Sequence, residues 1–495
     1  MITVKKSTVG LLITLLLAGC SMQPAPITPE ETRARVNSDR ALMALASQPV
    51  DGPISLYEAM ARALAFNLDL KLEQYKTNLA AQQLSMSRHD QLPEIVAGHI
   101  SDGRSNDSGG SSRSLLTGDE SLESSTSTER YTSTDDLGLS WDILDFGVSY
   151  YRAKQASDRV LLAHEQQKNV VNRILTDVQK TYWRAVSYDR LITQLESLME
   201  EVSEKLEESR QIEARGLDAP LTALKYQREL LYNKRELYGL YEDMAKAKIE
   251  LAALMNIPVD QEYALAPGHQ AVVLPGLPFT PEVMENIALE NRPELREVTY
   301  RKRINANEVK AALVGILPGI RIDYARNYDS NALLFNSDWT DYSARISWNL
   351  LAAYRYPDTK KVAEAQAETL DAQRLSLSAA VLTQVHVGVA RYQHTKNEFL
   401  IAKDLSEIQE KIRQQIELSV KAEASSDQTL INEQMNALLT EVRYDIAHAN
   451  LEGAYADLYA AMGISPALNE LDTSDLQALT DSLQYYFQSE RNQVK

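Results

Sequence analysis

Histidine, cysteine and paired carboxylates are the groups through which this chain could do chemistry, and their spacing argues against catalysis. The seven histidines are scattered, and none stands in the His-Glu-x-x-His spacing that presents two imidazoles to zinc. One cysteine cannot supply a thiolate cluster. Acidic pairs such as Glu207-Glu208 lie among lysines and arginines, which is typical of a solvated helix face. The sequence therefore predicts a protein that is not an enzyme and has no metal site or cofactor.

The single cysteine, Cys20, has a different predicted chemistry. A basic start precedes a short apolar run that ends in Leu17-Ala18-Gly19-Cys20. About ten apolar residues are too few to cross a bilayer, which needs about twenty, so residues 1–19 are interpreted as a signal peptide. Leu-Ala-Gly-Cys resembles a bacterial lipobox, which implies cleavage before Cys20, a covalent lipid on its sulfur and, with Ser21 next, sorting to the outer membrane. The alternative is a lone buried thiol behind an ordinary signal.

The charge of the chain limits its partners. The formal net charge is -18, and removing Lys5 and Lys6 with the signal peptide makes it -20. So acidic a chain is not expected to bind nucleic acid. After the signal peptide, charged residues interrupt every apolar run before it reaches the length of a membrane helix.

The sequence is duplicated, from about 56 to 258 and again from about 283 to 466. Each copy contains an Ala-Leu pair in a predicted helix, a Leu-Pro, a Ser-Trp, a long helical stretch and a closing Pro. Such self-similarity means that one structural unit occurs twice in the fold. The matched landmarks are Leu64 and Leu289, Pro93 and Pro318, Trp141 and Trp348, and Pro258 and Pro466.

Each copy is predicted to contain a long helical hairpin. Residues 150–214 contain neither Gly nor Pro, and their apolar positions recur at steps of three and four, a coiled-coil period. A helix of that length spans about 100 Å. A turn at 215–220 contains Gly and Pro, which suit the end of one helix and the start of the next. The second copy has a matching turn near 422–428.

Between these helices the sequence predicts four strands, two in each copy. Apolar and polar residues alternate with period two over 137–143, 320–325 and 342–350, and more weakly over 94–101. Such alternation suits a half-buried soluble sheet or the wall of a membrane barrel. Trp141, Trp339 and Trp348 lie in or beside the strands, where an interfacial girdle would place them. Four strands cannot close a barrel, so a barrel would require several chains.

Together, the lipobox, the duplicated order of elements and the turn Arg215-Gly216-Leu217-Asp218-Ala219 resemble the TolC-like outer-membrane efflux factors. The likeness covers about 54 to 466, and Cys20 suggests the lipidated branch. It implies a mainly α fold with a membrane β-barrel, in which a homotrimer forms a barrel of twelve strands in outer-membrane lipid and a periplasmic tunnel of twelve helices. It also implies a passive duct for efflux or type I secretion, which docks onto a periplasmic adaptor and an inner-membrane RND or ABC pump.

The resemblance also suggests functional residues at the two tips. Family tips commonly carry Gly, and here Gly216 stands in the first tip but Glu423 in the second. Family acids that close the tunnel align with Thr429 and Asn432, so the nearby Glu423, Asp427 and Glu433 are the candidate constriction. Arg215, Gly216 and Asp218 are the candidate adaptor contacts. The alternative is that these residues only cap helices at solvated turns.

These expectations divide the chain into six segments and leave one rival interpretation of its function. The predicted segments are a signal peptide (1–19), a lipid-anchored tether (20–53), repeat 1 (54–258, with loop 101–133), a linker (259–280), repeat 2 (281–466, with loop 327–338) and a C-terminal tail (467–495). The rival interpretation is a periplasmic coiled-coil lipoprotein scaffold without a pore. It accounts for the helices and the lipid, and leaves the alternating strands and their polar loops unexplained.

Overall fold

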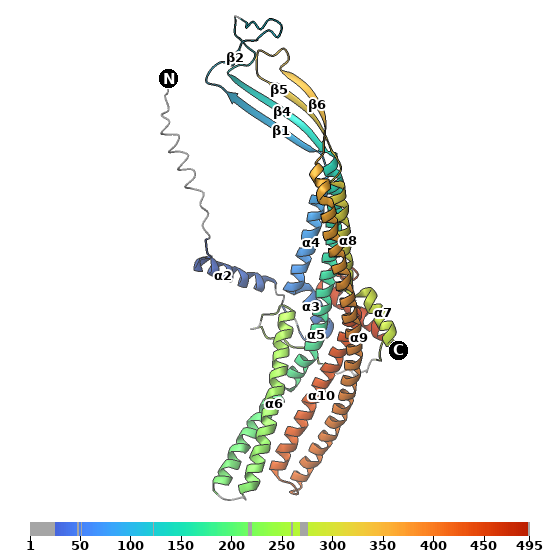
Figure 1. Ribbon diagram of the computed structural model, residues 1–495. Coiled ribbons are helices and arrows are strands. Elements are labelled where there is room, and N and C mark those ends of the chain that lie inside the picture. The colour runs from blue at the N-terminus through green and yellow to red at the C-terminus, as the bar shows by residue number, and fades with distance from the viewer. Residues whose placement is uncertain are drawn as a thin grey trace.

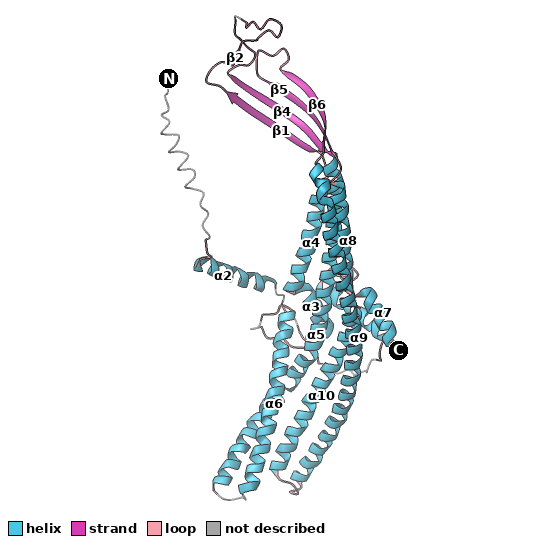
Figure 2. Ribbon diagram, viewed as in Figure 1, coloured by secondary structure: helices cyan, strands magenta, loops and turns pink. Residues whose placement is uncertain are grey.

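The chain forms a long molecule with a sheet at one end and two helical tips at the other (Figures 1 and 2). The computed structural model describes residues 25–46, 49–50, 52–121, 123–215, 220–258, 261–267 and 276–493. Helices form a wall that runs from the sheet to the tips, and short helices lie against this wall near its middle (Figure 2). Within the described residues, no helix combines the length and the apolarity that crossing a bilayer requires.

One antiparallel sheet of four strands caps the wall. Its order is β1-β4-β5-β6, so β1 and β6 are its edges. The strands run longer toward the loops than the alternation predicts, because polar residues continue the pairing. The expected loops 101–133 and 327–338 therefore shorten to 104–130 and 330–337, and the first contains the small pair β2 (Gly109–Gly110) and β3 (Ser125–Thr126). The four main strands are β1 (Glu94–Gly103), β4 (Tyr131–Asp142), β5 (Gly319–Asp329) and β6 (Asp338–Ser347).

Two helices of 72 residues run from the sheet to the tips, α5 (Ile143–Ala214) and α9 (Leu350–Lys421). At 1.5 Å per residue each is about 110 Å long. Each begins within three residues of a strand, at an Asx cap: the Asp142 carboxylate accepts from the Leu144 amide, and the side-chain Oδ1 of Asn349 accepts from the Leu351 amide. These caps satisfy amides that a helix start leaves unpaired. Each turn from strand to helix is thus short and fixed.

Shorter helices complete the wall around α5 and α9. Toward the sheet, α4 (Leu68–His89) packs on α5, and α8 (Pro293–Val314) packs between α5 and α9. Toward the tips, α6 (Pro220–Leu254) packs on α5, and α10 (Asp427–Met462) packs between α5 and α9. The two copies therefore contribute equivalent elements, as the duplication predicts.

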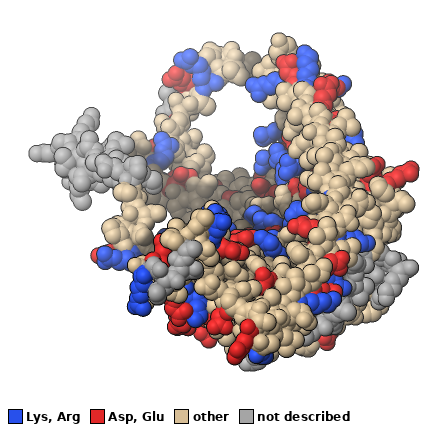
Figure 3. Space-filling view, turned by 90° about the horizontal axis from the view of Figure 1, so that it is seen from below, with Lys and Arg blue, Asp and Glu red and all other residues tan. Residues whose placement is uncertain are grey.

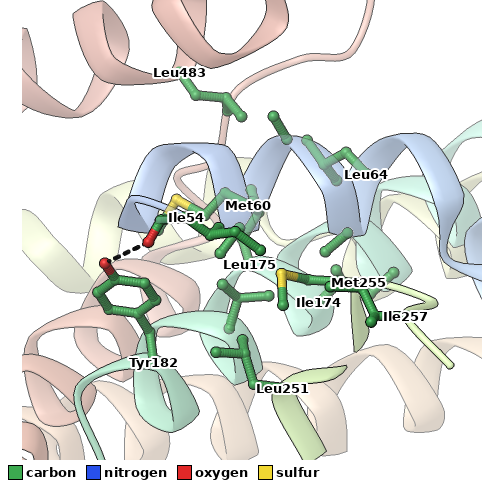
Figure 4. Packing of buried hydrophobic residues seen from close by; sticks show 14 of the residues in the cluster. Ile54, Met60, Leu64, Ile174, Leu175, Tyr182, Leu251, Met255, Ile257 and Leu483 are labelled. Atoms are coloured by element: carbon green, nitrogen blue, oxygen red, sulfur yellow. Dashed lines mark hydrogen bonds between the residues drawn. The ribbon is translucent and has the colours of Figure 1, made fainter. Parts of the chain in front are cut away.

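The middle of the wall carries the largest apolar core (Figure 4). Helix α3 (Leu56–Phe66) lies between α5 and the C-terminal helix α11 (Leu476–Gln493), whose Leu483 is fully buried. The Tyr182 hydroxyl of α5 donates to the Ile54 carbonyl over 3.1 Å, which fixes the chain entering α3. Two further short helices are α2 (Pro29–Ala46) and α7 (Pro281–Asn291), and α7 packs on α9 and α10.

Candidate functional site: the sheet faces and the helical tips

The two faces of the sheet differ in chemistry. Directly paired residues share a face, so the register sorts every side chain. One face is apolar over its half nearest the helices, and its large side chains are exposed: Tyr342 is 85% exposed and Leu137 58% exposed. An exposed apolar band of this kind requires lipid or protein against it. The side chains that share this apolar face include Ile95, Ala97, Leu137, Leu139, Trp141, Ile320, Ile322, Tyr324, Tyr342, Ala344 and Ile346.

The opposite face is polar and strongly acidic. Its strand residues carry seven carboxylates and two guanidinium groups, which gives a formal charge of -5. Near the helices, Asp323 accepts from Arg321 over 3.0 Å and from the Ser343 hydroxyl over 3.1 Å. The charged residues of this polar face are Glu94, Asp102, Asp136, Asp142, Asp323, Asp329, Asp341, Arg321 and Arg345.

The predicted tryptophan girdle is divided between these faces. Trp141 lies on the apolar face, opposite Ile322. Trp348 follows β6 at the same end of the sheet, where its indole N–H donates to the Ile316 carbonyl over 2.9 Å. Trp339 pairs with Asn327 and therefore lies on the polar face, at the loop end. Trp339 is three residues from Tyr342, an odd step, which puts its side chain on the other side of the strand from Tyr342 and Trp141.

The second tip contains a non-glycine residue in the left-handed region. Glu423 has φ +58°. Its amide donates to the Val420 carbonyl, and the Ala424 amide donates to the Ser419 carbonyl, which together form a Schellman motif. Glycine is the usual residue at this position, because a side chain is disfavoured there. The Glu423 carboxylate is exposed and therefore available to a partner.

The other two acids of the candidate constriction lie in different surroundings. Asp427 is exposed at the first position of α10, where the Ser426 hydroxyl caps the helix by accepting from the Thr429 amide over 3.2 Å. Glu433 is half-buried two turns later and accepts from the Gln409 side chain of α9 over 2.6 Å. The structure thus holds Glu433 against α9 and leaves Asp427 open to solvent.

The first tip and the anchor are only partly described. Arg215 is the C-cap of α5, and its amide donates to the Gln211 and Glu213 carbonyls. Gly216 and Asp218 lie outside the described residues, as does Cys20. Seen from the tips, acidic and basic side chains are interspersed over this end of the molecule (Figure 3). Among the described residues, no group of three or more His, Cys, Asp or Glu side chains could hold a metal ion.

Sequence patterns missed the ionic clamp between the two hairpins. Arg190 of α5 pairs with both Glu441 and Asp445 of α10, and its Nη2 lies 2.5 Å from the Asp445 carboxylate. Arg443 of α10 pairs with Glu236 of α6. Pairs so distant in sequence leave no periodic signal. A groove of about 1500 Å³ runs beside this clamp along α5, α9 and α10.

The geometry agrees with comparisons to known proteins. The outer membrane efflux protein family matches residues 59–256, which covers the first repeat. This match makes residues 59–256 similar to the outer membrane efflux proteins. No curated protein matches the chain.

Solved channels share its fold at low sequence identity. The CmeC outer membrane channel of Campylobacter jejuni is 13% identical, with a TM-score of 0.62 over 89% of this chain and 90% of that one. The open-state MtrE outer membrane channel of Neisseria gonorrhoeae is 16% identical, with a TM-score of 0.61 over 82% and 88%. The outer-membrane channel OprN is 15% identical, with a TM-score of 0.62 over 82% and 89%. At such identities the likeness shows the mainly helical fold with a four-stranded sheet.

Proposed function

We propose that three copies of this chain form one continuous passive duct, in which their sheets close a twelve-stranded barrel in the outer membrane and their helical walls form a periplasmic tunnel. One observation carries the proposal: the sheet has one exposed apolar face, one acidic polar face and two unpaired edges. Lipid would cover the apolar face, and water in the duct would solvate the polar one.

The free edges supply the reason for assembly. In lipid, every backbone amide and carbonyl needs a partner, so an open sheet edge is excluded there. Pairing β6 of one copy with β1 of the next satisfies both edges and closes the ring. Three four-stranded sheets give twelve strands, more than the eight or so that side chains alone can fill, which leaves an aqueous lumen.

The lipid anchor is part of this proposal. Cleavage after Gly19 would leave Cys20 at the N-terminus, with a diacylglycerol group that inserts into the inner leaflet of the outer membrane. The 33 residues from Ser21 to Pro53 would then connect the anchor to α3. Mass spectrometry of the mature N-terminus tests this: a free Cys20 thiol would refute the lipidated assignment.

The tips are the proposed contacts with the export machinery. A periplasmic adaptor would bind at Arg215, Gly216 and Asp218 and link the duct to an inner-membrane RND or ABC pump that supplies the energy. At the second tip, Glu423, Asp427 and Glu433 of three copies would gather nine carboxylates around one axis and attract cations. The support is the exposure of Glu423 and Asp427, and the absence of any salt bridge to either within the described residues.

Two measurements on the purified, full-length protein distinguish the duct from a pore-free coiled-coil scaffold. Native mass spectrometry in detergent is expected to show trimers, and planar bilayers are expected to show discrete conductance steps. A monomer or helical dimer that stays soluble without detergent after delipidation, and gives no steps, would favour the scaffold. The Glu423→Ala, Asp427→Ala, Glu433→Ala triple variant is expected to conduct with weaker cation selectivity; unchanged selectivity would remove these acids from the constriction.

A further inference from the structure

The polar face of the sheet contains one large aromatic side chain in an unusual place. Trp339 of β6 lies at the loop end of this face, 40% exposed, among acidic and amide side chains. Its paired neighbour on β5 is Asn327, which is paired in turn with Asp136 of β4. Strands lie about 4.8 Å apart, so Asp136 and Trp339 stand about 10 Å apart across one row. Asp341 follows Trp339 on the same face, about 7 Å further along β6.

Two details describe the row between its acid and its indole. Asp136 lies over Gly98 of β1: a Cβ atom at Gly98 would come within 2.3 Å of a carboxylate oxygen of Asp136. The carboxylate therefore leans away from Trp339, and only Gly98 leaves it room to do so. Between the two, the Asn327 amide nitrogen is buried and has no hydrogen-bond acceptor within the described part of the chain. A buried donor without a partner is costly, so a rotation of the Asn327 side chain that presented this amide to a bound acceptor would stabilise the row.

We propose that Trp339, Asp136, Asn327 and Asp341 form a binding subsite for organic cations that carry an apolar ring system and a hydrogen-bond acceptor, inside the outer half of the duct. The indole face attracts a cation and stacks on a ring, the carboxylates balance its charge, and the Asn327 amide donates to its acceptor. The subsite rests on the proposed trimeric duct, because only there does the polar face line a lumen. It also locates cation preference in the sheet, independently of the tip acids.

The test measures block of single channels by rhodamine 6G, a cationic ring system with ester oxygens, added on the loop side of wild-type trimers in planar bilayers. In the Trp339→Leu variant the half-blocking concentration is expected to rise about two- to thirtyfold, the range that loss of one cation–π contact gives. Trp339→Tyr is expected to retain much of the block, because the tyrosine ring also attracts cations. In Asp136→Asn, both the block and the cation-over-anion permeability ratio are expected to fall.

The neighbouring strand positions supply matched controls. Asp135 and Trp141 point to the apolar face, so Asp135→Asn and Trp141→Leu change the same residue types outside the proposed lumen. Both controls are expected to leave block unchanged. Wild-type block in conducting Trp339→Leu and Asp136→Asn channels would overturn the subsite and leave the duct intact, as would block that disappears only in the triple tip variant. If intact trimers gave no conductance, the duct itself would fail and the subsite with it.

Discussion

Arg190 of α5 and Asp445 of α10 join the two hairpins through a contact of 2.5 Å, and Glu441 binds the same guanidinium. The Asp445 side chain is only 12% exposed, so it depends on Arg190 for its countercharge. Arg190 thus connects the first repeat to the second in the half of the wall that leads to the tips, as the Arg443–Glu236 pair also does.

Replacing Arg190 by alanine should loosen this connection. Because Asp445 would remain largely buried without a partner, we expect a local loss of about 1–3 kcal/mol. Hydrogen exchange over 187–200 and 436–450 should show faster opening. The control is Arg210→Ala on the same helix, whose pair with Glu207 is well exposed and should contribute little. Equal protection in both variants would show that the clamp does not hold the hairpins together.

Glycine at position 423 should stabilise the second tip. Glu423 adopts φ +58°, where glycine avoids the cost of a side chain, so Glu423→Gly should gain about 1 kcal/mol. The matched control is Ala422→Gly, at φ -91°, which should destabilise the helix end instead. Amide exchange of 418–424 measures both. Faster exchange in Glu423→Gly would mean that the carboxylate stabilises the turn by more than its backbone strain costs.

Acidification should act in opposite directions on two parts of the wall. Burial raises the pKa of Glu297, on α8, above its ordinary 4.5, against the opposing effects of Arg301, Gln166 and Asn169. Its ionised form therefore destabilises the fold at neutral pH, and stability is regained as the pH falls through the raised pKa. A hydrogen bond from Arg413 lowers the pKa of Glu410 below its ordinary 4.5. The stability that ionised Glu410 gives the fold is therefore fully present above pH 4.5 and is lost as the pH falls through the lowered pKa.

Amide hydrogen exchange measured at pH 7.5 and at successively lower pH, corrected for intrinsic exchange rates, tests both predicted directions of the change in stability. The α8 amides of the wild type should gain protection relative to Glu297→Gln, which cannot ionise. The amides around 410 should lose protection relative to Glu410→Gln. Parallel trends in the two regions would contradict the assigned directions.

The loops should depend on one asparagine. The Asn331 side chain is nearly buried; it donates to the Ser127 carbonyl over 2.8 Å and accepts from the Glu129 amide over 3.3 Å. Asn331→Ala leaves both backbone groups unpaired, so loop 104–130 should become more sensitive to protease added to intact cells. Arg113→Ala, which removes only an exposed pair with Glu120, should not change cleavage. Equal cleavage of both variants would show that Asn331 does not hold the loop.

Patterns of period two and period 3.5 were sufficient to predict the strands, the long hairpins and their duplication, because burial imposes those periods. The pattern of period two did not predict the strand ends nearest the loops, because Thr132, Thr134 and Asp136 lie in a stretch where most of the intervening residues are also polar. The face of the sheet on which Trp339 lies could have been predicted by counting from Tyr342 along one strand. Nothing in the sequence could have paired Arg190 with Asp445, because that contact depends on the relative rotation of two helices that lie far apart in the chain.

Continuity distinguishes α5 and α9 from every other helix of the wall. Their partners are interrupted at the middle: α4 and α6 are separate pieces, and so are α8 and α10. Only α5 and α9 therefore transmit axial load or torque between the tips and the sheet, while the interrupted pieces can adjust locally at the apolar core. Mechanically, the chain is a pair of stiff rods whose packing partners are jointed at mid-height, so a force applied at a tip reaches the sheet through these two helices.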